Sequence, residues 1–127
     1  MYKFLSHALL SALGIFMLSA CSDGPKPLYD YGDYSQKYYN LKKDQNENSL
    51  LAFEKAMQES IEKSPQSRSM RVAPGMYANL GYLYLKSGRT KEALANFEQE
   101  KAIYPESTHF MNRMIKKIEL AQEGDKK

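Results

Sequence analysis

Few residues in this chain are of types that could catalyse a reaction or bind a metal. There is one cysteine, Cys21, and there are two histidines, His7 and His109, at opposite ends of the sequence. A metal site needs several ligands at suitable spacing, and no such set surrounds either histidine. No Ser-His-Asp or Cys-His combination is apparent either. The sequence therefore favours a non-enzymatic protein that needs no metal and no other cofactor.

Two short stretches match fragments of known site patterns. Residues 44–48, DQNEN, open like a calcium-binding loop, but Ser49 stands where that loop needs its turn glycine, and Lys55 where it needs a glutamate. Ser60 and Lys63 have the serine-to-lysine spacing of penicillin-binding enzymes, without the companion motifs of that class. We interpret the first stretch as a solvated loop that caps a helix, and the second as chance spacing on an exposed helix face.

The N-terminal residues have the layout of a secretory signal peptide. Lys3 precedes an apolar run over residues 4–17, and the small residues Ser19 and Ala20 follow. A helix that spans a bilayer needs about 20 apolar residues, which this run does not reach. We therefore expect residues 1–20 to be removed from the mature protein.

The context of Cys21 indicates a lipid anchor. Leu18-Ser19-Ala20-Cys21 resembles the bacterial lipobox, in which the cysteine is linked to diacylglycerol and becomes the acylated first residue. Several acyl chains, at about 0.8 kcal/mol per buried methylene, hold a small domain at a membrane. In similar lipoproteins an Asp after the cysteine retains the protein at the inner membrane, so Ser22 implies transfer to a Gram-negative outer membrane. There we expect the domain to face the periplasm, and the cell surface is the alternative. The alternative is an ordinary signal peptide followed by a free cysteine without a disulfide partner.

Composition indicates one small domain that does not bind nucleic acid. The 107 residues after residue 20 contain one cysteine, so packing must stabilise the fold without a disulfide inside the chain. The whole chain has a formal net charge of +3, without the clustered basic face that nucleic acid binding needs. Residues 22–27, SDGPKP, are polar and contain one Gly and two Pro, which predicts a tether over residues 21–30 between the lipidated cysteine and the domain.

The apolar residues that follow recur at helical spacing and predict an all-α domain over residues 31–122, with a disordered tail over residues 123–127. About five helices are expected, near residues 33–42, 48–64, 74–87, 90–104 and 108–122. Asn48 and Thr90 are suited to N-caps, and Pro74 to the first turn of the third helix. One face of the first helix is expected to carry Tyr31, Tyr34, Tyr38 and Leu41. The last helix is expected to bury Phe110, Met111, Met114, Ile115 and Ile118.

Residues 74–105, PGMYANLGYLYLKSGRTKEALANFEQEKAIYP, resemble a tetratricopeptide repeat, a helix-turn-helix unit of about 34 residues. The positions that carry the resemblance are Tyr77, Leu80, Gly81, Tyr84, Gly88, Ala93, Phe97 and Pro105. It implies tetratricopeptide-like helical hairpins whose two helices approach closely at Gly81 and Ala93. Residues 108–122 continue the register as a half repeat, and the first two helices look like a degenerate repeat. Glu100 departs from the pattern, and a charge there is expected to sit poorly between packed helices.

The resemblance also implies a binding surface, because the first helices of such repeats line a concave groove. The register assigns to this surface Ala78, Tyr82, Lys86, His109, Asn112, Arg113 and Lys116. These side chains suit an acidic peptide, with Tyr82 as a flat apolar contact. The alternative interpretation is a charged helix face that is merely solvated.

The chain after residue 20, with its segments YDYGDYSQKYY and FEQEKAIYPES, is similar to a family of small Gram-negative lipoproteins with this repeat. Genes of that family often lie beside genes for a curli-channel-like lipoprotein and a further lipoprotein. The resemblance therefore implies partners among envelope lipoproteins or secretion-channel-like proteins. We expect a protein-protein interaction module or assembly factor of a cell-envelope complex. The alternative is an accessory factor that contacts peptidoglycan or the polysaccharide machinery.

Overall fold

The computed structural model describes residues 24–124, and all of their regular structure is helical. The α-helices are α2 (Tyr34–Asp44), α3 (Glu47–Lys63), α4 (Met76–Lys86), α5 (Thr90–Ile103) and α6 (Thr108–Gly124). Single turns of 3-10 helix follow α3 and α5, namely η2 (Ser64–Gln66) and η3 (Pro105–Ser107). The predicted all-α class is confirmed. The expected signal peptide over residues 1–20 and the lipidation residue Cys21 lie outside the described residues.

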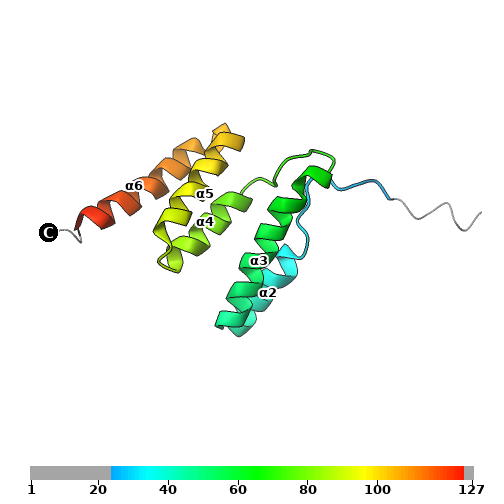
Figure 1. Cartoon of the computed structure of the whole chain (residues 1–127), viewed down its shortest axis with the longest axis horizontal. Helices are drawn as coiled ribbons and strands as arrows, with labels where there is room; N and C mark the ends of the chain where they lie inside the picture. The colour runs from blue at the N-terminus through cyan, green and yellow to red at the C-terminus, as the bar shows by residue number, and fades with distance from the viewer. Residues whose placement is uncertain (1–23, 125–127) are drawn as a thin grey trace, which may run out of the picture.

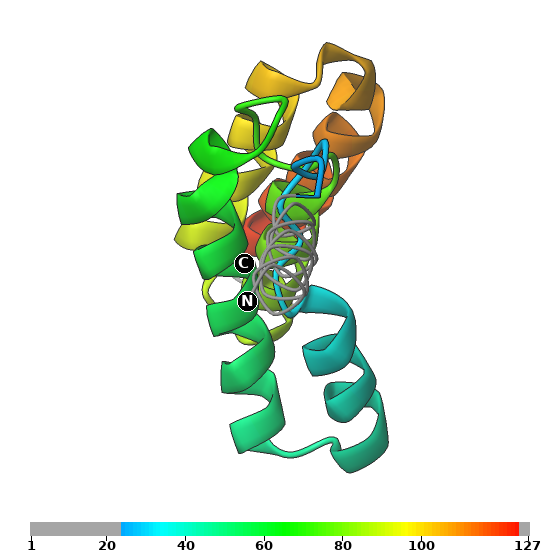
Figure 2. The ribbon, with the colours of Figure 1, turned by 90° about the vertical axis from the view of Figure 1, so that its right-hand side faces the viewer.

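The helices form two antiparallel hairpins and a closing helix. In Figure 1, α2 runs along α3, and α4 runs along α5. Figure 2, turned by 90°, shows α2 and α3 again side by side, so their pairing does not depend on the view. The two hairpins meet where α3 contacts α4, and α6 covers α5 on the side away from the first hairpin (Figure 1).

Helix α3 begins at a reciprocal cap. Asn46 Oδ1 accepts the backbone N–H of Ser49 at 2.8 Å, and Ser49 Oγ accepts the N–H of Asn46 at 3.2 Å. The expectation that Asn48 caps this helix was wrong, because Asn46 has the extended backbone from which a side chain reaches the third helical residue. The helix ends at Lys63, before Pro65, as expected.

The second hairpin turns at Gly88, whose φ of +74° lies in the left-handed region. The N–H of Gly88 donates to Leu85 O at 3.1 Å, and the N–H of Arg89 donates to Tyr84 O at 2.8 Å. These two bonds satisfy carbonyls at the end of α4 that have no partner within the helix. The glycine was predicted to stop the helix, and it lies two residues beyond the last residue, Lys86.

Two expected helix starts differ from the structure. Pro74 lies outside α4, which begins at Met76 after Gly75 adopts a left-handed φ of +80° at the N-cap. Thr90 is the first residue inside α5, and Arg89 takes the N-cap position. The backbone conformation of the preceding turn, which composition does not reveal, moves the start of α4 two residues later than Pro74 and the cap of α5 one residue earlier than Thr90.

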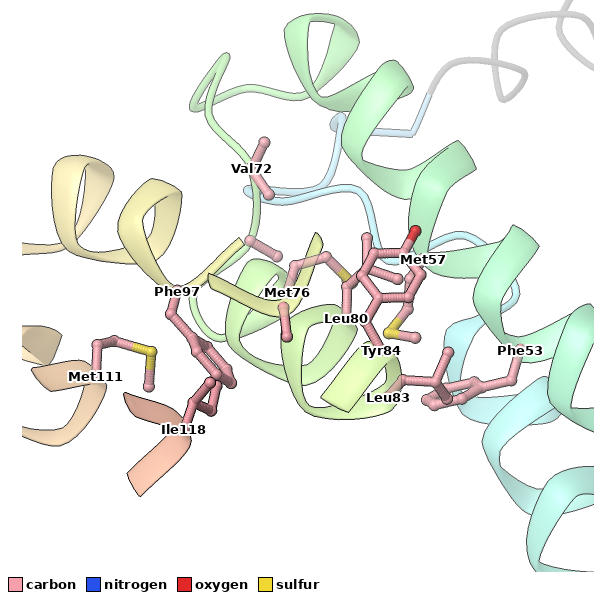
Figure 3. Packing of buried hydrophobic residues seen from close by; sticks show 12 residues of the cluster. Phe53, Met57, Val72, Met76, Leu80, Leu83, Tyr84, Phe97, Met111 and Ile118 are labelled. Carbon is pink, nitrogen blue, oxygen red and sulfur yellow. The ribbon is translucent and has the colours of Figure 1, made fainter. Parts of the chain in front are cut away.

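One hydrophobic core runs through both hairpins and α6 (Figure 3). Its largest fully buried apolar side chains are Phe97, Met57, Met76 and Met111. The expectation that the last helix buries Phe110 was wrong, since this residue is 58% exposed. Met111 and Ile118 face α5, and Phe110 lies one position off that stripe, about 100° around the helix. On the first helix face, Tyr31 and Tyr38 are 46% and 43% exposed.

Helices α4 and α5 cross closely at Gly81. A Cβ atom placed on Gly81 would lie 2.8 Å from Phe97 Cε1 and 3.1 Å from the carbonyl oxygen of Ala93. Ala93 and Phe97 are themselves buried, at 0% and 1% exposure. The absence of a side chain at residue 81 therefore allows the two helices to approach, with the Phe97 ring filling the space beside the crossing.

The expected tether over residues 21–30 is in part attached to the domain. The N–H groups of Arg68 and Ser69 donate to the carbonyls of Pro27 and Leu28, each at 3.0 Å. Tyr29 packs against the core. Residues 27–29 are thus part of the folded domain, because the loop after η2 offers backbone donors that the sequence pattern did not indicate. At the other end, residues 123 and 124, expected in the tail, belong to α6, and residues 125–127 lie outside the described part.

Candidate functional site

A cavity of about 450 Å³ lies between the two hairpins. It is lined by residues of α2 and α3 from the first hairpin, and by residues of α4 and its C-cap from the second. We call it the α2–α4 groove; its lining residues are Tyr34, Tyr38, Leu41, Lys42, Leu50, Phe53, Asn79, Tyr82, Leu83, Lys86 and Ser87. A concave apolar surface with a few polar groups is the usual form of a binding site.

The groove has an aromatic floor. Phe53 and Leu83 are buried, at 5% and 7% exposure. The Phe53 ring lies 5.1 Å from the Tyr34 ring and 5.5 Å from the Tyr38 ring, and the two tyrosines stack with nearly parallel planes. Burial, and then the neighbouring Tyr38 and Tyr31, raise the pKa of Tyr34. The hydroxyl of Tyr34 therefore stays neutral and accepts a hydrogen bond from Asn79 Nδ2 of α4 at 3.0 Å.

The rim of the groove combines exposed aromatic surface with positive charge. Tyr38 and Tyr82 are 43% and 51% exposed. Two lysines, Lys42 from α2 and Lys86 from α4, line the same space, and the lining contains no Asp or Glu. Lys42 Nζ lies 5.4 Å from the centre of the Tyr38 ring, a cation–π contact that holds the amine near the groove. The groove is thus apolar at its base and cationic at its edge.

The structure brings together only part of the residue set predicted to bind a partner. Tyr82 and Lys86 line the α2–α4 groove. Ala78, half-buried on the same helix, uses its backbone N–H to contact Glu100. The four residues from α6 are exposed and do not line this groove: His109, Asn112, Arg113 and Lys116. The binding role of these four residues stays a prediction.

Sequence reasoning missed the contribution of α2 to the groove. The spacing of Tyr34, Tyr38 and Leu41 indicated a helix face, and two of these side chains do contact Phe53. The same face also turns toward Tyr82 and Lys86 across the groove. The sequence feature that could have indicated this contribution is the excess of tyrosine on α2, because tyrosine is suited to a surface whose base is apolar and whose edge is exposed to solvent.

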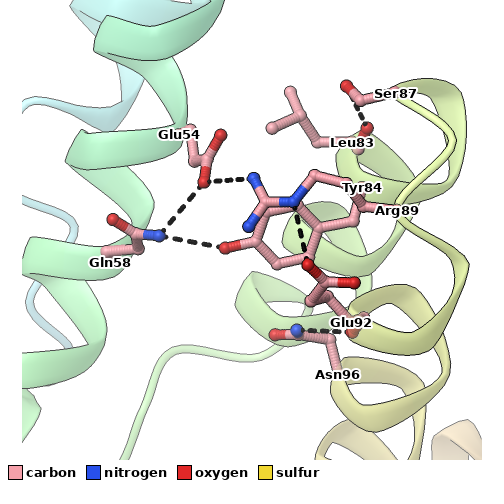
Figure 4. A network of polar contacts seen from close by, with 8 residues as sticks. All are labelled: Glu54, Gln58, Leu83, Tyr84, Ser87, Arg89, Glu92 and Asn96. Atoms are coloured by element: carbon pink, nitrogen blue, oxygen red, sulfur yellow. Dashed lines mark hydrogen bonds and ion pairs between the residues drawn. The ribbon is translucent and has the colours of Figure 1, made fainter.

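A polar network joins α3 to the turn between α4 and α5 (Figure 4). Gln58 Nε2 donates to Tyr84 Oη at 2.9 Å, and Arg89 Nη1 donates to Glu54 Oε1 at 2.8 Å. The Arg89 guanidinium also lies 4.0 Å from the centre of the Tyr84 ring and donates to Glu92. The hydrogen bonds to Glu54 and then to Glu92 raise the pKa of Arg89 above its usual value. Because these contacts bridge the two hairpins, they help to fix the width of the groove.

Glu100 is the buried charge that the sequence analysis expected to pack poorly. It is 3% exposed, and its two carboxylate oxygens accept the N–H of Gly75 at 2.7 Å and the N–H of Ala78 at 3.2 Å. Both donors belong to the start of α4, where the helix dipole favours a negative charge. The expectation was wrong because the carboxylate caps the partner helix, a role for which Gly75 has no side chain.

Two further features of residues 24–124 concern metals and membranes. In this part of the chain no three side chains among His, Cys, Asp and Glu come together in a way that could hold a metal ion. Over the same residues no helix has both the length and the apolar character that crossing a bilayer requires.

The comparisons with known proteins give a family. Residues 28–114 match a domain of unknown function, DUF4810, and this match covers more than half of the chain. The chain therefore belongs to the DUF4810 family. The match begins at the segment that is hydrogen-bonded to the loop after η2, and it ends within α6. No curated protein and no solved structure gives a match.

Proposed function

Since the family to which the chain belongs has no assigned function, we propose one from the geometry: a non-enzymatic protein-protein interaction module of a cell envelope. The observation that carries the proposal is the α2–α4 groove, with its buried aromatic floor and its rim of Lys42 and Lys86. Its lining contains no His, Cys, Asp or Glu. A concave apolar surface of this kind is suited to binding and positioning a partner.

The chemistry of the lining defines the partner segment. The aromatic floor and the exposed Tyr38 and Tyr82 favour an apolar side chain as anchor, since aromatic residues are the common hot spots of interfaces. The two lysines favour a carboxylate beside that anchor, because opposite charges across an interface guide docking. The partner presents a peptide segment that has a large apolar residue next to Asp or Glu.

The proposed architecture is a short tetratricopeptide-like array. In this assignment α2–α3 and α4–α5 are successive hairpins and α6 is a capping half repeat. The close approach at Gly81 beside Phe97 supports it, as does the turn at Gly88. The first helices of the two hairpins are then α2 and α4, and their shared groove is the one lined by Tyr38 and Tyr82.

The proposed location is the periplasmic face of an outer membrane, with Cys21 as the lipid anchor. Support comes from the lipobox-like sequence over residues 18–21 and from Ser22 after it. Anchoring would hold the domain among other envelope lipoproteins or secretion-channel-like proteins, which are the proposed class of partner.

The proposal is tested by photocrosslinking in cells. Tyr38 and Tyr82 are replaced in turn by a photoreactive amino acid, and crosslinked proteins are identified by mass spectrometry. The matched control is Tyr39, which neighbours Tyr38 on α2, is 62% exposed, and does not line the groove. The expected result is one envelope protein captured from both groove positions and absent from the control.

Other outcomes contradict the proposal in different ways. Equal crosslinking from Tyr39 and Tyr38 would mean that the adducts reflect crowding and not a groove. A photoreactive amino acid is also placed at Arg113 in α6, and capture from that position without capture from Tyr38 or Tyr82 would move the site to α6. Binding of the protein to purified sacculi that depends on Tyr38 and Tyr82, and that is lost when muramidase digests the sacculi, would favour an accessory factor that contacts glycan.

A further inference from the structure

The segment that leads toward Cys21 is attached to one corner of the domain. Residues 27 and 28 pair with the loop after η2 through the N–H groups of Arg68 and Ser69, each at 3.0 Å. The hydroxyl of Ser60 donates to the carbonyl of Asp30, which holds the same segment against α3. The chain therefore leaves the domain in a fixed place, next to residues 67–70.

Two large apolar side chains stand exposed at this corner. Met70 is 73% exposed and Leu28 is 49% exposed. The hydrogen bond from the N–H of Ser69 to the carbonyl of Leu28 places the backbone of Leu28 beside the residue that precedes Met70. Met70 also has a left-handed φ of +52°, which glycine or asparagine adopts at lower cost. Folding therefore does not require methionine at this position, and its side chain is free to contact something outside the domain.

Basic residues outnumber acidic residues at the same corner. Residues 24–30 and 59–73 contain Lys26, Lys63, Arg68 and Arg71, against the acidic residues Asp30, Glu59 and Glu62, and Lys63 Nζ lies 3.9 Å from Glu59 Oε2. The Asp30 carboxylate is engaged with the N–H of Gly32 at 2.8 Å. Arg71 stacks over Tyr104, with 4.8 Å between the guanidinium carbon and the ring centre. Basic residues around exposed apolar side chains suit a surface of anionic lipid headgroups, where each Lys or Arg contributes about 1 kcal/mol.

The length of chain before this corner restricts what it can face. From Cys21 to Pro27 there are six residue steps, which span at most about 20 Å when fully extended. We propose that the corner formed by Leu28, Arg68 and Met70 rests on the lipid surface, so that the domain is held in one orientation. This inference rests on the proposed lipid anchor at Cys21. In this arrangement the folded domain contacts the membrane directly, in addition to its lipid anchor. The rest of the domain then points away from the membrane.

The test uses the lipidated full chain in vesicles of phosphatidylethanolamine and phosphatidylglycerol. Because the chain has one cysteine, which the lipid blocks, Met70→Cys supplies a single free thiol for an environment-sensitive fluorophore. Quenching by spin-labelled phospholipid is then measured. The matched controls are Leu51→Cys, near the opposite end of α3, and Leu120→Cys in α6, which replace side chains that are 55% and 57% exposed. We expect quenching at residue 70 to be several-fold stronger than at residues 51 and 120.

A charge variant gives an independent arm. Arg68→Glu in the Met70→Cys background should reduce the quenching in vesicles with phosphatidylglycerol and change it little in phosphatidylcholine vesicles. Flotation of the unlabelled protein separates the two proposals. A protein that floats with the vesicles but is quenched equally at residues 70, 51 and 120 would overturn the inference and leave the anchor intact. A lipobox-intact protein that does not float would overturn both.

Discussion

Replacing Glu100 tests whether a buried carboxylate helps to hold the two helices of the second hairpin together. Its oxygens accept hydrogen bonds from Gly75 and Ala78 at 2.7 and 3.2 Å, and the side chain is 3% exposed. It therefore serves the N-cap and the third residue of α4 at once, from a different helix. Glu100→Ala removes both acceptors and the negative charge from the positive end of the helix dipole.

The size of the effect follows from these two bonds. A hydrogen bond to a charged group contributes about 1.5–3 kcal/mol, and an N-cap residue about 1 kcal/mol. Gly75 and Ala78 are only half-buried, so water can replace part of the lost bonding. We expect Glu100→Ala to lower the free energy of unfolding by about 2–4 kcal/mol. Glu100→Gln keeps one acceptor oxygen and should cost about half as much.

The assay is urea unfolding followed by circular dichroism, with the free energy of unfolding extrapolated to water. The control is Gln99→Ala, an exposed neighbour on the same helix, which should change the free energy by less than about 0.5 kcal/mol. If Glu100→Ala unfolds at the same urea concentration as Gln99→Ala, the carboxylate does not cap α4, and our account of its burial is wrong.

Three further predictions concern the crossing of α4 and α5 at Gly81, the buried Tyr104, and the proposed lipid anchor at Cys21. Gly81→Leu should lower the free energy of unfolding by about 1–3 kcal/mol, because even a Cβ would lie 2.8 Å from Phe97; an unchanged melting curve would contradict the close crossing. Burial raises the pKa of Tyr104 from 10.0 to about 12, so the folded state keeps a proton that the unfolded state loses, and stability should fall between pH 10 and 12. In Tyr104→Phe the free energy of unfolding, measured by urea titration at several alkaline pH values, should fall less steeply with pH. If it falls as steeply as in the wild type, other groups cause the fall. Cys21→Ala should abolish incorporation of labelled fatty acid, and undiminished label would disprove the anchor.

The sequence predicted the helices well because their apolar residues recur at regular spacing. Leu80, Ala93 and Phe97 lie in the core as that spacing indicated. Caps were less predictable: Asn46 and Asn48 have equal capping propensity, and the backbone conformation of the preceding turn selects Asn46. Phe110 was misplaced because it is apolar and directly precedes the buried Met111, although consecutive residues of an α-helix point about 100° apart.

The candidate groove was less predictable than the fold. Tyr82 and Lys86 were identified from the repeat register, but their neighbours come from α2 and not from α6. Which helices share a groove depends on how the hairpins are oriented, and cross-hairpin contacts such as Arg89 with Glu54 contribute to that orientation. Pairs of this kind, 35 residues apart in sequence, have no local signal.

The most direct test of the groove is a peptide selection with charge reversal. A displayed peptide library is selected against the wild-type protein and against a variant with Lys42→Glu and Lys86→Glu. Our account predicts that wild type enriches peptides with a large apolar residue beside Asp or Glu, and that the variant loses these and enriches basic peptides. Enrichment of the same peptides by both proteins would contradict the assignment of the α2–α4 groove as the binding site.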